Sequence, residues 1–118
     1  MEYNSIFLSS GDKADANLII IDDNQALTDA WILSGEMAGK HVVAFNKIND
    51  FRSVMTQYNK NVPIYIDSDL NDIIKGQDFA KELYEDGFVN IYLATGFLPQ
   101  DFPKMYWIKE VVGKEPPF

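Results

Sequence analysis

Short apolar runs alternate with segments of helical spacing along most of the chain. The run "NLIIID", residues 17–22, is continuously apolar up to its final acid, which is typical of a strand buried on both faces of a sheet. Residues 26–40 then show helical spacing, with Gly39 where a helix would end. This alternation predicts an α/β fold with a parallel sheet and right-handed crossovers. Further strands are predicted at residues 41–45, 62–67, 89–95 and 111–114, and further helices at residues 47–61, 75–88 and, as a short piece, within 98–111.

Composition excludes several classes of function. The 118 residues are enough for one domain. The chain has no cysteine, which excludes a disulfide framework and a thiolate metal site. Its single histidine, His41, argues against histidine metal sites and a Ser-His-Asp triad. The formal charge of −8 argues against direct binding of nucleic acid.

The sequence shows the pattern of neither a membrane-spanning segment nor a signal peptide. No apolar run approaches the roughly 18 to 20 residues needed to span a bilayer. The first residues lack the basic start and apolar stretch of a signal peptide. We therefore expect a cytoplasmic domain at residues 17–118, preceded by a lead-in or linker at residues 1–16 with one short ordered piece around Ile6 to Leu8.

Acidic side chains follow two of the predicted strands. Asp22 and Asp23 follow the first strand, and Asp67 and Asp69 follow the third. Ligands of such sheets bind at the carboxyl ends of the strands. If these strands are neighbours the carboxylates converge, and two of them about 4 Å apart repel by roughly 4 kcal/mol at an effective dielectric near 20. Such a cluster holds a proton at a raised pKa or binds a cation, and hard oxygen donors suit Mg²⁺ or Mn²⁺.

A hydroxyl and an ammonium follow the last two strands. Thr95 ends the fourth strand and Lys114 the fifth. Beside a metal, these two groups can steady a phosphoryl group during transfer.

The stretches "LIIIDDN", "PIYIDSDL" and "LATG", with a terminal lysine followed by prolines, resemble the receiver domain of bacterial two-component response regulators. The resemblance covers residues 17–118. It implies a CheY-like (flavodoxin-like) three-layer fold, with helices on both faces of a five-stranded parallel sheet. The last helix would be missing, because the chain stops at "KEPPF".

The resemblance also implies a function and a role for each strand-end residue. The domain, from a response regulator or a hybrid histidine kinase, would take a phosphoryl group from a sensor histidine kinase or phosphotransfer protein. It would not be an enzyme beyond Mg²⁺-dependent self-phosphorylation and self-dephosphorylation. The implied roles are phosphoacceptor for Asp67, Mg²⁺ binding for Asp22, Asp23 and the Asp69 carbonyl, switch hydroxyl for Thr95, and phosphoryl partner for Lys114.

Several positions depart from the family pattern. Asn71 stands where the family has a proline four residues after the acceptor. One residue separates Lys114 from the first proline, and Lys109 is the alternative for the active-site lysine, although it follows Thr95 too closely to leave room for a helix. Without a last helix we expect one face of the first and third strands to be partly bare. The N-terminal segment around Ile6, Phe7 and Leu8, or a second copy of the chain in a homodimer, would cover that face.

Simpler interpretations remain open for each of these residues. The acids after the first strand could cap a helix, Asp67 could be an exposed strand exit, Thr95 an ordinary strand residue and Lys114 a solvated lysine. Two other functions remain as well. One is a pseudo-receiver that acts only as a protein-interaction module, and the other is a Mg²⁺-dependent phosphatase with an aspartyl nucleophile.

Overall fold

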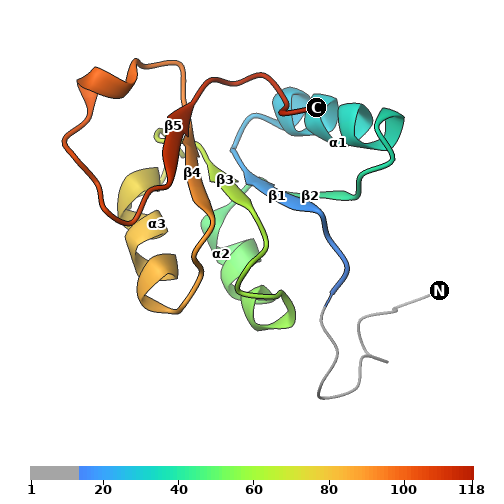
Figure 1. Cartoon of the computed structure of the whole chain (residues 1–118), viewed down its shortest axis with the longest axis horizontal. Coiled ribbons are helices and arrows are strands. Elements are labelled where there is room, and N and C mark those ends of the chain that lie inside the picture. Colours follow the sequence, from blue (N-terminus) through green and yellow to red (C-terminus); the bar gives the residue numbers. More distant parts are fainter. Residues whose placement is uncertain (1–13) are drawn as a thin grey trace.

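A computed structural model of the chain describes residues 14–118 (Figure 1). Strands and helices alternate along it as the sequence predicts. The strands are β1 (Leu18–Ile21), β2 (Val42–Phe45), β3 (Ile64–Ile66), β4 (Ile91–Ala94) and β5 (Glu110–Val112). The helices are α1 (Gln25–Met37), α2 (Ile48–Arg52) and α3 (Gly76–Glu85), with single 3₁₀ turns at η2 (Met55–Gln57) and η3 (Pro99–Asp101).

The five strands form one sheet in the order β2-β1-β3-β4-β5, and every neighbouring pair is parallel. The chain runs outward from β1 to β2 and then crosses back to β3 on the other side of β1. Helix α1 covers one face of the sheet, and α2 and α3 cover the opposite face (Figure 1). This three-layer arrangement confirms the predicted CheY-like fold class. The reversal between β1 and β3 places their carboxyl ends side by side, where ligands of such sheets bind.

Strand β1 is continuously apolar because both of its faces are buried. Ile19 and Ile21 point into the larger core between the sheet and helices α2 and α3. Leu18 and Ile20 pack on the other face against Trp31 of α1. All four strand residues are almost fully buried, so the sheet centre holds the residue that follows β1 in a defined place.

The helix predicted at residues 47–61 is wrong in its length. It breaks after α2, and a 3₁₀ turn, η2, follows. The Ser53 hydroxyl donates a hydrogen bond of 2.8 Å to the carbonyl of Asp50, and Val54 leaves helical geometry with φ −126°. A serine bonded to its own helix backbone competes with continuation of the helix. The predicted apolar stripe still faces the core, where Phe51 and Tyr58 are buried.

The segment after β5 occupies the place of the last helix, which the sequence predicts to be missing. Among residues 14–118 no helix follows β5, and the C-terminal residues instead cross towards α1 (Figure 1). The indole nitrogen of Trp31 donates a hydrogen bond of 2.9 Å to the backbone carbonyl of Lys114. The predicted bare face is therefore wrong for β1, because α1 and its tryptophan cover Ile20 completely.

The prediction of a partly bare face agrees better with β3 than with β1. Tyr65 is half-buried and stacks on Tyr92 of β4, with ring centroids 4.5 Å apart and planes 8° apart. The segment around Ile6 to Leu8 that was expected to cover this face lies outside the described residues, and the homodimer stays a prediction. Of the predicted lead-in, Ala14 and Ala16 pack against the larger core.

The loop after β3 is shaped by two residues. Asn71 has φ +48°, a value that proline cannot adopt, which accounts for the absence of the family's proline here. Gly76 begins α3 in contact with the strand end, and a Cβ built on it would lie 1.8 Å from the carbonyl oxygen of Asp67. The close approach of α3 to Asp67 thus requires glycine.

We expect Gly76→Ala to destabilise the domain by more than about 2 kcal/mol, because backbone atoms would have to move to admit the methyl group. Urea unfolding measures the change. Gly96→Ala is the matched control, since nothing lies within 4 Å of its Cβ position, and it should change stability by no more than about 0.5 kcal/mol. Equal stability of the two variants would contradict the contact.

Candidate functional site

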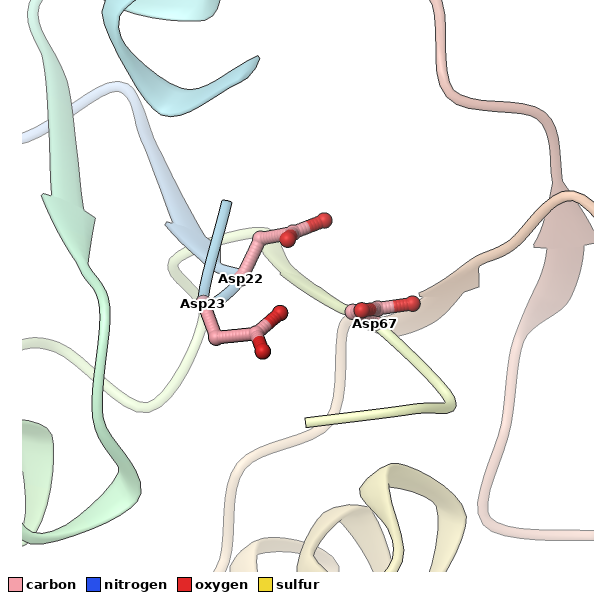
Figure 2. A group of neighbouring side chains, drawn as sticks. All are labelled: Asp22, Asp23 and Asp67. Atoms are coloured by element: carbon pink, nitrogen blue, oxygen red, sulfur yellow. The ribbon is translucent and has the colours of Figure 1, made fainter. Parts of the chain in front are cut away.

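Three carboxylates meet at the carboxyl ends of β1 and β3 (Figure 2). Ile21 and Ile66 are partners in the parallel ladder, so Asp22 and Asp67 leave the sheet side by side. Asp22 is 1% exposed and Asp67 is 7% exposed, whereas Asp23 is exposed. One oxygen from each of the three carboxylates lies within 4.8 Å of the others. Asp69 is exposed and its carboxylate is not part of this group.

Local hydrogen bonds give Asp22 and Asn24 different roles at the start of α1. Asn24 is the N-cap of α1, and its side-chain oxygen accepts a hydrogen bond of 3.2 Å from the backbone N–H of Leu27. Asp22 accepts a bond of 2.9 Å from the Asn24 backbone N–H, which sets the turn between strand and helix. Asn24 is therefore the residue that caps the helix, and Asp23 is the exposed member of the carboxylate cluster.

Lys114 bridges the two buried acids. Its Nζ lies 2.6 Å from an Asp22 oxygen and 2.7 Å from an Asp67 oxygen. Lys109 lies elsewhere, with its Nζ 3.2 Å from the side-chain oxygen of Asn90, just before β4. Of the two candidate lysines, only Lys114 is paired with the carboxylates.

Burial and pairing act in opposite directions on these charges. Burial raises the pKa of Asp67, the hydrogen bond from Lys114 lowers it, and the charge of Asp22 raises it again, leaving the pKa above its usual value. Burial alone would lower the pKa of Lys114, but its hydrogen bonds to Asp22 and Asp67, together with the negative charges of these two acids, outweigh burial and raise it. The lysine therefore stays charged, and its charge is what keeps two neighbouring carboxylates tolerable.

A pair of buried hydroxyls lies on the β4 side of this cluster. Thr95, directly after β4, is 2% exposed, and its Oγ1 lies 2.9 Å from the Oγ of Ser68. Thr95 Oγ1 also accepts a bond of 3.2 Å from the Phe97 backbone N–H. Thr95 is thus more than an ordinary strand residue, because its hydroxyl takes part in two hydrogen bonds at the strand end.

Three residues of the site escaped the sequence analysis. Ser68 stands within "PIYIDSDL", between Asp67 and Asp69, and the two acids drew attention away from it. Asn46, directly after β2, donates bonds of 2.7 Å to the Asp22 carbonyl and 3.1 Å to the Thr28 hydroxyl. Asn46 could have been predicted as a site residue, because it is a polar residue that directly follows a predicted strand. Trp31 holds the Lys114 backbone across 83 positions of sequence, and no local pattern predicts that contact.

The donor set fits a hard divalent cation. Asp22, Asp23 and Asp67 with the Lys114 ammonium leave two negative charges uncompensated when all four groups are ionised. Carboxylate oxygens without histidine or cysteine are the ligands that Mg²⁺ prefers. Charge and chemistry therefore agree with the Mg²⁺ expected from the sequence.

Comparisons with known proteins bear on the fold. No protein-family model and no curated protein sequence matches the chain. Its structure matches that of a CheY-like response regulator receiver domain from Methylobacillus flagellatus, with a TM-score of 0.69 and 20% identity over 89% of each chain. The chain has the fold of a receiver domain. It also matches the response regulator StyR, with a TM-score of 0.66 and 17% identity, over 89% of this chain and 53% of StyR.

At such low sequence identity, similarity to receiver domains shows the fold alone. The chemistry of the site has to be argued from the residues of this chain. Within residues 14–118, no helix has the length and apolar character that a membrane crossing needs. The structure brings together five of the residues singled out from the sequence, namely Asp22, Asp23, Asp67, Thr95 and Lys114, at one edge of the sheet.

We expect Asp67→Asn to raise the free energy of unfolding at neutral pH, because burial disfavours the charged carboxylate. The pKa of Asp67 is higher in the folded than in the unfolded chain, so its protonated form contributes stability that is lost as pH rises through the folded pKa. The advantage of the variant should shrink as pH falls and vanish below pH 3.8, the unfolded value. Urea unfolding at several pH values tests this, with exposed Asp15→Asn as control. A variant less stable than wild type at neutral pH would show that pairing outweighs burial.

We expect Lys114→Met to destabilise the domain by about 1–3 kcal/mol, because it leaves Asp22 and Asp67 facing each other without a cation. The partial exposure of the lysine keeps the loss below that of a fully buried pair. Lys109→Met is the matched control and should cost no more than about 0.5 kcal/mol. Urea unfolding of both variants measures the difference, and a larger loss at Lys109 would refute the assignment.

Proposed function

We propose that this chain is the phosphoacceptor receiver domain of a two-component phosphorelay, with Asp67 as the acceptor. One observation carries the proposal. The nearly buried carboxylate of Asp67, at the end of a central strand, pairs with Lys114, and Lys114 also pairs with a second acid, Asp22. The receiver fold supports it, since the site lies at the carboxyl edge where β1 and β3 meet.

In the proposed reaction Asp67 attacks the phosphorus of a phosphohistidine on a sensor histidine kinase or phosphotransfer protein. An oxygen–phosphorus bond forms as the phosphorus–nitrogen bond breaks, and the bonding electron pair stays on the histidine nitrogen, which is protonated from solvent. The Lys114 ammonium, already 2.7 Å from Asp67, donates to an oxygen of the incoming phosphoryl group. Thr95 supplies a hydroxyl from the neighbouring strand end.

Asp22, Asp23 and Asp67 would hold Mg²⁺, with the Asp69 carbonyl as a further ligand. When bound, the metal supplies positive charge to the phosphoryl oxygens. The chain's own contribution is to orient the acceptor and to hold the Lys114 ammonium beside it. The proposed domain would not turn over an external substrate, beyond its own phosphorylation and dephosphorylation.

A phosphorylation-independent interaction module is the second candidate. It is favoured by the outer elements, because a single 3₁₀ turn stands between β4 and β5 and no helix follows β5 in residues 14–118. The phosphatase reading is weaker. It needs an acid two residues after the nucleophile behind the first strand, and that position is Asn24, which caps α1.

Acetyl phosphate with Mg²⁺ tests the proposal on the full chain by intact mass. Wild type is expected to gain one phosphoryl group, and the gain should be lost in Asp67→Asn and on chelation of Mg²⁺. Asp69→Asn, two positions away and exposed, should still be labelled, because only its backbone is invoked. Absence of label from wild type would favour the interaction module. Repeated release of phosphate from a phosphate monoester such as p-nitrophenyl phosphate would favour the phosphatase, because self-dephosphorylation of the proposed receiver already releases phosphate from acetyl phosphate.

A further inference from the structure

A buried hydrogen bond joins the hydroxyls of Ser68 and Thr95 beside the proposed acceptor. Ser68 directly follows Asp67, and Thr95 directly follows β4, the neighbour of β3 in the sheet. The two oxygens lie 2.9 Å apart, and the residues are only 6% and 2% exposed. Solvent therefore has little access to either hydroxyl.

The backbone on both sides of this bond is held in place. The Thr95 backbone N–H donates to the Val112 carbonyl at 3.0 Å, which extends the β4–β5 ladder. The Ser68 carbonyl accepts from the Gly76 backbone N–H at 3.2 Å, at the point where Gly76 touches the Asp67 backbone. With both backbones held, rotation about side-chain bonds is the motion left to the two hydroxyls.

The hydrogen bonds of Thr95 show what such a rotation must give up. Its oxygen accepts from the Phe97 backbone N–H, and its second partner is Ser68. Thr95 is also the partner that the structure gives to the Ser68 hydroxyl. If Thr95 turns to a phosphoryl group on Asp67, the bond breaks and leaves Ser68 unpaired in a buried place, which is unfavourable.

We propose that Ser68 is a positioning residue that holds the Thr95 hydroxyl in the unphosphorylated arrangement and so opposes the switch to the phosphorylated one. The inference rests on the proposed function, and it adds an element of regulation to the same site. Ser68 need not touch the phosphoryl group. Its hydrogen bond to Thr95 must break before Thr95 can bind the phosphoryl group, and this loss weakens the net interaction between Thr95 and that group.

Beryllofluoride, a phosphoryl mimic, with Mg²⁺ is the probe, and its affinity for the full chain is measured by NMR titration. Ser68→Ala should bind it about 2- to 10-fold more tightly than wild type, the range expected for release of one hydrogen bond. Ser53→Ala is the matched control, because it also removes a single serine hydroxyl bond, in this case to a backbone carbonyl, but it lies at the end of α2 and should leave the affinity unchanged.

A double-mutant cycle separates positioning from a merely structural role. In a Thr95→Val background the bond is already absent, so adding Ser68→Ala should no longer tighten binding. A purely structural Ser68 would instead lower thermal stability and affinity together, in either background. Ser68→Cys keeps the side-chain volume and weakens the bond, and its affinity should fall between wild type and Ser68→Ala. It carries the test if the alanine variant does not fold.

The outcomes distinguish this inference from the proposed function. Unchanged or weaker binding by Ser68→Ala and Ser68→Cys, while Asp67→Asn abolishes binding, would overturn the inference and leave the phosphoacceptor intact. No binding by wild type would overturn both. Tighter binding that persists in the Thr95→Val background would also overturn the inference, because the effect would not pass through Thr95.

Discussion

The bridge from Lys114 to Asp22 and Asp67 is the interaction on which the rest of this site depends. Two nearly buried carboxylates leave neighbouring strands together, and without a cation between them their repulsion and lost hydration would oppose the fold. The lysine comes from beyond β5, a three-residue edge strand with modest burial of its own. Its ion pairs therefore also fasten the edge of the sheet to the centre.

The strong patterns of the sequence were sufficient for the sheet and the acids. A parallel sheet needs strands buried on both faces, and a run such as that of β1 shows this directly. Because carboxyl ends of parallel strands share one edge, the placement of Asp22 beside Asp67 followed from adjacency alone. The break after α2 could not be foreseen from apolar spacing, because the stripe continues through it while a Ser53 hydroxyl bond ends the helix.

Contacts between distant polar residues account for what sequence analysis missed. Ser68 has no periodicity and no charge, and its meaning comes from a partner 27 positions away. The same is true of Trp31. Its aromatic ring is indistinguishable in sequence from an ordinary core residue, and its role comes from the hydrogen bond that its N–H donates to the Lys114 carbonyl. Sequence patterns report burial and charge well, but a single hydrogen bond between separate elements depends on the final placement of both.

The bond from Trp31 to the Lys114 carbonyl connects α1 directly to the carboxylate cluster at the ends of β1 and β3. The indole holds the backbone of the same residue whose ammonium holds Asp22 and Asp67. A protein that binds the C-terminal tail where it lies against α1, and shifts it, must also disturb that ammonium. A change of charge at Asp67 that moves Lys114 should therefore alter the affinity for such a protein. By reciprocity, binding of that protein alters the equilibrium for the change at Asp67 by the same factor. Within residues 14–118, where no helix follows β5, one tryptophan thus links the C-terminal tail to the centre of the site.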